Sequence, residues 1–175
     1  MLSVFKEIIS ESIADKKIRG NIKSYAFQSM LTFVCVFIAL LFHELLGGII
    51  VASLGASSFI IFVTPHTKSS RARNVLGGYV CGAVAGILFS LLHTYISGLG
   101  HDGLRYTLIL ICAAASAVTT LLMIATGLVH PPAAALALGL AADPDCLRTA
   151  VAAILGIAIL CAARRVLRNR IKDLI

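Results

Sequence analysis

The chain of 175 residues is 59% hydrophobic, carries only 13% charged residues and has a mean hydropathy of +0.97. Because soluble domains carry about 25% charged residues, this composition excludes a soluble protein and predicts one compact integral membrane domain. The formal net charge of +7 does not indicate a nucleic-acid partner, because the basic residues flank apolar segments and form no recognisable nucleic-acid-binding motif.

A cytoplasmic tail, residues 1–24, is the first predicted region. Within it, residues 2–18 repeat apolar side chains at helical spacing, with Lys and Glu on the opposite face. This pattern predicts an amphipathic helix on the cytoplasmic surface of the lipid bilayer, and a mobile tail is the alternative. The early charged residues argue against a cleavable signal peptide, which needs an apolar core near the N-terminus.

Charge-free segments within the next region, residues 25–163, mark the predicted membrane crossings. Four of them have 18 to 22 residues, close to the roughly 20 that cross a hydrocarbon core, whereas the last two have 12 and 15. The segments are Tyr25–Phe42, Leu45–Thr64, Val75–Ile96, Tyr106–Thr126, Pro131–Ala142 and Thr149–Ala163. We therefore predict an all-α, polytopic transmembrane helix bundle of about six spans, two of them short or broken.

The distribution of Lys and Arg predicts the orientation of these spans. Five basic residues precede the first span, three follow the second, and five lie in the basic tail, residues 164–175, while only Arg105 and Arg148 fall on the opposite side. Because cytoplasmic segments are rich in Lys and Arg, we expect both termini in the cytoplasm of a bacterial inner membrane. Two cytoplasmic termini require an even number of membrane crossings, so Pro131–Ala142 must cross the membrane or nearly cross it.

Spans one to three and four to six then run in opposite directions, as a 3+3 inverted repeat requires. The middle span of each half is interrupted, by glycines that include Gly55 in the first half and by two prolines in the second. Adjacent prolines break a helix interior but are tolerated in its first turn. One helix is therefore predicted to end near Gly127 and another to begin at Pro131.

Three glycines, Gly78, Gly82 and Gly86, recur four residues apart in the third predicted span. Small residues on one helix face allow another helix to approach closely, so this stripe predicts packing inside the bundle or between subunits. Six helices in so short a chain form a thin bundle, which favours a homo-oligomer.

The sequence HPPAAALA at residues 130–137 resembles the motif that names the HPP family of integral membrane proteins. A second block is similar to the family's pattern of a Gly-Ala-Ser helix start, a proline loop and an Asn-Val-Ile-Gly-Gly opening; here it reads GASS at 55–58, PH at 65–66 and RNVLGG at 73–78. The resemblance covers residues 25–163, and it departs at Ala133, where Gly is frequent.

This resemblance implies an HPP-type transmembrane domain at residues 25–163. The family is usually counted as having four membrane spans, whereas the charge-free segments predict six. Plant plastid and cyanobacterial members are implicated in nitrite transport. The implied function is a secondary transporter or channel for a small inorganic anion, with nitrite as the first candidate.

The two interrupted spans are predicted to aim helix N-termini at a mid-membrane site. Unpaired N–H groups and the helix dipole there hold a monovalent anion without a buried cation. Ser57 or Ser58 would cap a helix or bind the anion, and His130 would donate a hydrogen bond or carry a coupled proton; capping roles for His130 and Asn74 are the alternatives. The predicted substrate-binding residues are Gly55, Ala56, Ser57, Ser58, Asn74, Thr126, His130, Pro131, Pro132 and Ala133.

A basic cytoplasmic mouth formed by His66, Arg71 and Arg73 is predicted to attract anions, with solvation and topology as the alternative roles. No metal and no cofactor are expected, because the Cys and His residues show no ligand spacing. The few carboxylates and the lack of an evident nucleophile–base set argue against an enzyme. A non-catalytic membrane scaffold or sensor subunit is the main alternative function, and a membrane enzyme is a further one.

Overall fold

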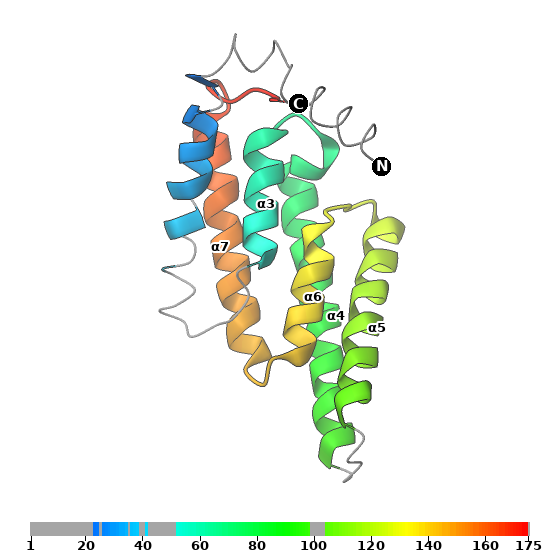
Figure 1. Ribbon diagram of the computed structural model, residues 1–175. Helices are drawn as coiled ribbons and strands as arrows, with labels where there is room; N and C mark the ends of the chain where they lie inside the picture. The colour runs from blue at the N-terminus through cyan, green and yellow to red at the C-terminus, as the bar shows by residue number, and fades with distance from the viewer. Residues whose placement is uncertain are drawn as a thin grey trace, which may run out of the picture.

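The computed structural model describes residues 23–24, 26–34, 36–38, 41, 52–98 and 104–174, and the regular elements of this part are all helices (Figure 1). They are α3 (Ala52–Val63), the short 3-10 helix η1 (Lys68–Ser70), α4 (Ala72–Gly98), α5 (Leu104–Thr126), α6 (Pro132–Ala142) and α7 (Cys146–Leu167). The described residues between Ala26 and Ile38 are also helical. The predicted amphipathic helix at 2–18 and the start of the second predicted span, 45–51, lie outside the described residues. The predicted all-α membrane bundle is confirmed.

The helices fall into two length classes. Helices α4, α5 and α7 are long and apolar enough to cross a membrane. Helix α3 has 12 residues and α6 has 11, and at about 1.5 Å per residue α6 is only about 17 Å long. A hydrocarbon core is about 30 Å thick. Helix α6 is therefore long enough to cover about half of a membrane, and how far Pro131–Ala142 crosses it stays a prediction.

Helix α7 corrects the prediction of a short sixth span at Thr149–Ala163. It has 22 residues and includes the arginines at both ends of the charge-free segment. Arg is a good helix former whose long side chain can reach water from an apolar surface, so the helix continues past the charges. Helix α4 is likewise longer than its predicted span, Val75–Ile96, and begins at Ala72. Asn74 therefore lies inside the first turn of α4 and does not precede it as a cap.

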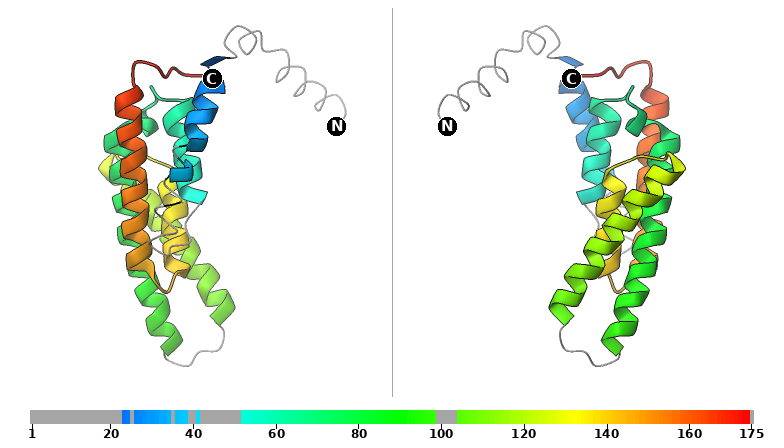
Figure 2. Two further views of the ribbon diagram at one scale, coloured as in Figure 1. Left: turned by 90° about the vertical axis from the view of Figure 1, so that its left-hand side faces the viewer. Right: turned by 90° about the vertical axis from the view of Figure 1, so that its right-hand side faces the viewer.

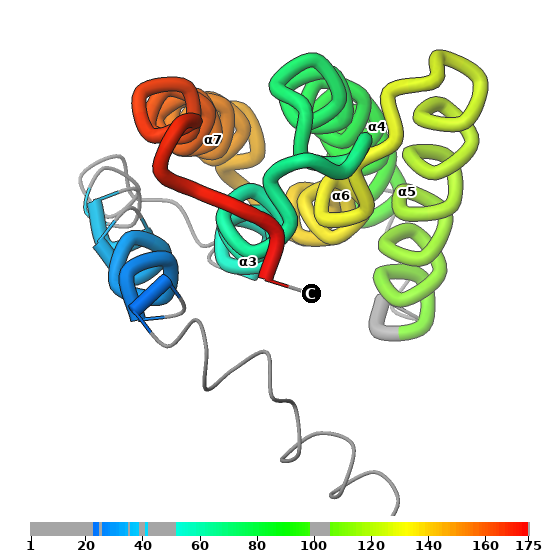
Figure 3. The backbone as a smooth tube through the Cα atoms, turned by 90° about the horizontal axis from the view of Figure 1, so that it is seen from above, coloured from blue at the N-terminus to red at the C-terminus, as the bar shows by residue number. Residues whose placement is uncertain are grey.

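Helix α6 lies at the centre of the arrangement and packs against α3, α4, α5 and α7. Seen from above, the short helices α3 and α6 lie side by side, with α7 and α4 along one side of them and α5 beyond α6 (Figure 3). Helices α3 and α6 run in opposite directions, and the α4–α5 hairpin extends beyond the end of α6 (Figures 1 and 2). The two short helices are the middle elements of the two predicted repeats; the repeat itself remains a prediction.

The glycine stripe of α4 brings α6 close to it. A Cβ atom at Gly82 would lie 2.5 Å from the backbone oxygen of Ala133, and one at Gly86 would lie 2.6 Å from Leu140 Cβ. At Gly78 the nearest atom would be His130 Cβ, at 2.8 Å. Only glycine fits these positions without moving α6. The prediction that the stripe packs inside the bundle is thus confirmed.

Large apolar side chains cover the outer surface of the long helices. Val80 and Leu88 of α4 and Leu110, Leu121 and Ile124 of α5 are half or more exposed. A water-soluble protein rarely exposes such a continuous apolar surface, whereas lipid tails solvate it without cost. The outer faces of these helices are therefore the lipid-facing surface of an integral membrane protein.

The segment after α7 folds back across the end of α3. The backbone N–H of Leu174 donates to the carbonyl of Val63 at 3.0 Å. The buried Gln28 amide donates to the carbonyls of Phe62 and, at 2.8 Å, Lys172. The bonds to Phe62 and Val63 satisfy carbonyls at the C-terminal end of α3, which have no intrahelical partner. The predicted tail of residues 164–175 therefore begins inside α7 and ends as a strap over α3.

Candidate functional site

The helix break before α6 occupies residues 127–131. Helix α5 ends at Thr126, Gly127 has a φ of +67°, and α6 begins at Pro132 with Pro131 as its cap residue. A positive φ favours glycine, and the prolines lose no helical hydrogen bond at the first turn. The predicted break between Gly127 and Pro131 is confirmed, and it places His130 directly before α6.

His130 connects this break to the second turn of α3. Its Nε2 atom lies 2.9 Å from Ser57 Oγ, which lies 2.9 Å from the Tyr79 hydroxyl of α4. On the other side of the ring, Nδ1 lies 2.8 Å from the carbonyl oxygen of Ser69 in η1. The side chains of His130, Ser57 and Tyr79 are all fully buried. We call these three residues the His130 junction; it joins α3, α4 and the break before α6.

The hydrogen-bond partners determine where the protons lie. A carbonyl oxygen only accepts, so Nδ1 carries the proton that is donated to Ser69. In the neutral ring Nε2 then accepts from the Ser57 hydroxyl, whose oxygen in turn accepts from the Tyr79 hydroxyl. The junction is thus a directed chain of hydrogen bonds from Tyr79 to the Ser69 carbonyl. A second proton on the ring would reverse the bonds to Ser57 and Tyr79.

The N-terminus of α6 differs from the anion-binding tip expected from the sequence. Pro131 and Pro132 have no N–H group. The N–H of Ala133 donates to the His130 carbonyl at 3.0 Å, and that of Ala134 donates to the Pro131 carbonyl at 3.1 Å. Even the His130 N–H has a partner, the sulfur of Met123 at 3.4 Å. The first turn of α6 therefore lacks the unpaired N–H groups that the prediction assigned to it.

The predicted residues in α3 lie within its first two turns. The hydroxyl of Ser58 donates to the carbonyl of Gly55 at 2.7 Å, so Ser58 caps no helix. Ala56 is exposed, and a Cβ atom at Gly55 would have no neighbour within 4 Å. Among the predicted residues of α3, Ser57 is the one whose side chain contacts His130.

The remaining predicted residues surround the break. The Asn74 amide approaches the carbonyl of Val129 at 3.4 Å, which links the start of α4 to the linker. Thr126 is exposed, and its hydroxyl donates within α5 to Leu122 at 2.7 Å. Pro132 and Ala133 are buried, whereas Pro131 is exposed.

The predicted mouth residues lie at the end of the molecule where η1 and the C-terminal end of α7 meet. His66 is 60% exposed, and its Nδ1 lies 3.4 Å from a carboxylate oxygen of Asp173. Arg71 and Arg73 are exposed at the start of α4. His66 and Arg71 line the wall of a groove, and Arg73 is not among the described residues that line it.

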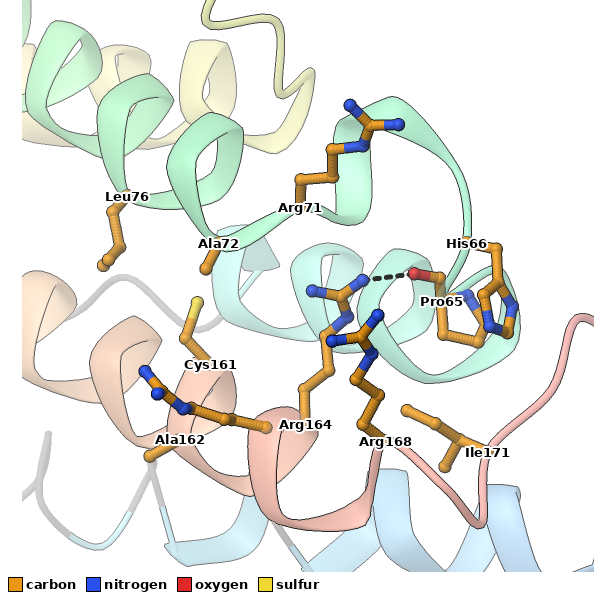
Figure 4. Close-up of a pocket in the computed structure, with 11 residues that line it drawn as sticks. Pro65, His66, Arg71, Ala72, Leu76, Cys161, Ala162, Arg164, Arg168 and Ile171 are labelled. Carbon is orange, nitrogen blue, oxygen red and sulfur yellow. Dashed lines mark hydrogen bonds between the residues drawn. The ribbon is translucent and has the colours of Figure 1, made fainter.

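This groove, which we call the basic groove, is a cavity of about 730 Å³ between the start of α4 and the end of α7 (Figure 4). Arg164 crosses it and donates from its guanidinium to the carbonyl of Pro65, with Ser70 Oγ at 3.5 Å. The positive charges of Arg168 and Arg71 act on Arg164. The described lining residues are Pro65, His66, Arg71, Ala72, Leu76, Cys161, Ala162, Arg164, Arg165, Arg168 and Ile171. None of them is acidic, so the groove is an electropositive site.

Several residues of both sites are not identifiable from the sequence alone. Tyr79 and the Ser69 carbonyl enter the junction through contacts that bridge 22 and 61 positions of the chain, and no local pattern indicates them. The arginines of α7 indicate membrane topology when the sequence is considered alone. Their spacing, Arg164, Arg165 and Arg168, was the available signal, because residues three and four apart share a helix face.

One comparison with known proteins gives a match. The family model described as HPP, transmembrane region, matches residues 17–173, nearly the whole chain. No curated protein and no solved structure matches the chain. The resemblance first noted at residues 130–137 is therefore confirmed at the level of the family.

Proposed function

The chain belongs to the HPP transmembrane family, and from this membership we propose that it is a secondary transporter or channel for a small inorganic anion, with nitrite as the first candidate. The observation that carries the proposal is the 2.9 Å hydrogen bond between Ser57 and His130. This bond joins the two short helical segments, and interrupted segments of this kind build the substrate sites of many transporters.

The substrate site that we propose lies between α3 and the break before α6. In the described conformation the hydrogen bonds of the junction are made within the protein and its side chains are fully buried, which is the closed state of such a site. Separation of α3 from α6 by a few ångströms would release the Ser57 hydroxyl and the His130 ring to an anion. Gly55, Ala56 and Ser58 on α3, with Pro131, Pro132 and Ala133 at the start of α6, would form the walls, and Asn74 and Thr126 would line the path to them.

The direction of the hydrogen bonds couples the anion to a proton. In the neutral junction Nε2 is an acceptor, and an acceptor repels an anion. A proton on Nε2 makes it a donor and supplies the positive charge that the first turn of α6 does not. The hydroxyl of Tyr79 then needs a new acceptor, and the fully buried hydroxyl of Ser53, in the preceding turn of α3, already interacts with it. We therefore propose that anion and proton bind together.

Anions would reach this site from the cytoplasm past His66, Arg71 and Arg73. Surface cations raise the local concentration of an anion and its rate of association. The exposed position of these three residues at the end of the molecule that carries the basic tail supports this role.

The test is anion flux into liposomes that contain the purified protein. Nitrite, nitrate, formate and chloride are offered in turn, with and without a proton gradient, and we expect nitrite flux that depends on the gradient. Ser57→Ala should lower the flux at least about tenfold. Ser90→Ala is the matched control, because Ser90 is also buried in the bundle and donates one hydrogen bond, to the carbonyl of Asp143. The absence of flux for every anion would contradict transport and leave the scaffold or sensor role.

The same Ser57–His130 pair favours a second candidate, a membrane hydrolase. A serine hydroxyl at 2.9 Å from an imidazole whose other nitrogen is held by an acceptor is the arrangement of a nucleophile and its base. Transport is favoured, because Ser57 is fully buried and its oxygen already accepts from Tyr79. Covalent labelling of Ser57 by a fluorophosphonate probe, lost in Ser57→Ala, would support the hydrolase instead.

A further inference from the structure

We propose that the basic groove binds the phosphate group of an anionic phospholipid from the cytoplasmic leaflet. The proposal concerns a different site from the His130 junction and does not depend on which anion is transported. It rests on the charge of the groove, on the apolar surface that continues from it, and on its size.

The charge of the groove is uncompensated within the described structure. Arg164, Arg165 and Arg168 line it at the C-terminal end of α7, and Arg71 lies on the opposite wall. The only acidic residue that an ion pair brings to its edge in the described part is Asp173, which pairs with His66. The dipole at the end of α7 supplies only about half a negative charge. A cluster of guanidinium groups with so little counter-charge is a binding site for an anion with several acceptor oxygens.

The geometry of the arginines fits a phosphate group. Arg164 is held by the Pro65 carbonyl, and Figure 4 shows the Arg168 guanidinium beside it, facing the same space. A guanidinium presents a planar fork of donors that matches phosphate oxygens in pairs. One fixed and one neighbouring fork can therefore hold a phosphate between them.

An apolar surface leads from the groove along the lipid-facing side of the bundle. Leu76, Ala162 and Ile171 line the groove itself. On α4 the exposed Val80 and Val84 follow Leu76 at four-residue intervals, so they extend its face along the helix. A charged end joined to an apolar channel of this kind accommodates a lipid headgroup together with the start of its acyl chains. A fully hydrated inorganic anion would gain nothing from the apolar part.

The size and position of the groove also favour a lipid. A volume of about 730 Å³ far exceeds that of a three-atom anion such as nitrite. The groove lies at the end of the molecule predicted to be cytoplasmic, where basic pockets between transmembrane helices bind anionic headgroups.

The experiment measures lipid binding by the full-length protein in nanodiscs of neutral phosphatidylcholine, titrated with phosphatidylglycerol. Each arginine near an anionic lipid contributes about fivefold to affinity, so Arg165→Gln/Arg168→Gln should weaken binding about 25-fold. The matched control is Lys68→Gln/Arg170→Gln. It removes the same charge at the same end of the molecule, from residues that are exposed and absent from the described lining, and it should weaken binding less than about threefold.

Two further arms separate the possible explanations. Arg165→Lys/Arg168→Lys keeps the charge at the end of α7 and is expected to fold normally, but it loses the forked donors and should weaken binding about three- to fivefold. Inorganic phosphate, as the second probe, should fail to displace the lipid at millimolar concentration. The proposal would be overturned if the two pairs of Gln substitutions weakened lipid binding equally. It would also be overturned if the protein did not prefer phosphatidylglycerol to phosphatidylcholine, or if inorganic phosphate displaced the lipid fully. Nitrite flux is scored separately, so the failure of one proposal leaves the other to be judged on its own data.

Discussion

Ser57 and His130, which lie 73 residues apart in the chain, share a buried hydrogen bond of 2.9 Å at the point where the two short helices of the bundle meet. The bond crosses the boundary between the two halves of the predicted repeat. A separation of α3 from the segment before α6 would break it, so substitutions at these two residues test the junction directly.

The stability of the His130 junction should depend on the order of its hydrogen bonds. Ser57→Ala leaves His130 Nε2 buried without its donor and forces the Tyr79 hydroxyl onto Ser53, at a cost of about 1–3 kcal/mol in the free energy of unfolding. Tyr79→Phe removes one donor and leaves the Ser57–His130 bond intact, at a cost of about 1 kcal/mol. Chemical unfolding in detergent measures both values.

The double variant Ser57→Ala/Tyr79→Phe tests whether the three side chains form one chain of hydrogen bonds. It no longer contains the Tyr79 hydroxyl that has lost the Ser57 acceptor, so we expect it to be at least as stable as Ser57→Ala alone, because the effects of substitutions at contacting residues are not additive. Additive losses would show that the three side chains do not act as one chain of hydrogen bonds.

The close packing of α4 on α6 should be intolerant of a single methyl group. In Gly82→Ala the new Cβ would lie 2.5 Å from the Ala133 carbonyl oxygen, and a backbone atom cannot rotate away. Displacement of α6 should cost about 1–3 kcal/mol, read as a lower unfolding temperature. The matched control is Gly55→Ala, where the Cβ would have no neighbour within 4 Å. That variant should be neutral or up to about 1 kcal/mol more stable, because alanine is the better helix former.

Local sequence signals predicted the parts of this fold that local chemistry determines. The two prolines at the start of α6 act on their own backbone, so the break at residues 127–131 could be placed within a residue or two. The glycine stripe likewise indicated a close helix contact, although the sequence could not identify α6 as the partner. These predictions succeeded because the residue type alone restricts the backbone.

Features that depend on distant partners were not predictable from the same sequence. The fate of the N–H groups of Ala133 and Ala134 depends on the turn geometry after the two prolines, so the expected anion-binding tip was wrong for α6. Tyr79 carried no signal, because its contact with Ser57 exists only after α3 and α4 pack. The charge-free segment predicts a span shorter than α7, because Arg148, Arg164 and Arg165 lie inside the helix.

The turn at Gly127 should require a residue that tolerates a positive φ. Gly127→Ala forces a Cβ into the left-handed region at φ +67° without any steric contact within 4 Å, so the expected loss of about 1 kcal/mol is backbone strain alone. Gly127→Asn should lose less, because asparagine visits this region more readily. Equal stability of the Ala variant and the wild type would mean that the linker can adopt another path.

The C-terminal strap should be released when Gln28 is replaced. Its amide donates to the carbonyls of Phe62 and Lys172, so Gln28→Met removes both bonds with little change in volume. Trypsin cleavage after Arg168 or Arg170 should then accelerate several-fold, as measured by mass spectrometry of timed digests. Thr32→Val is the control, because the Thr32 hydroxyl donates only to the Gln28 carbonyl of its own helix. An unchanged rate in Gln28→Met would show that the strap is held by other contacts.

Proton coupling gives the most direct test of the His130 junction as a transport site. Nε2 accepts a hydrogen bond in the neutral ring, so the site should hold an anion only after the ring gains a proton. Nitrite uptake should therefore rise as the external pH falls from about 8 to 5, with one proton entering per anion, as followed by a pH-sensitive dye inside the liposomes.

His130→Gln separates the donor from the proton in this scheme. The glutamine amide is a permanent donor without charge, so the variant should bind and carry nitrite weakly but lose most of the pH dependence. His93→Gln, a half-buried histidine of α4 outside the junction, should keep the wild-type profile. Apart from His130, no side chain of the junction titrates between pH 5 and 8. If His130→Gln retains the full pH dependence, the coupled proton must therefore be carried by a group outside the junction, which would contradict this scheme.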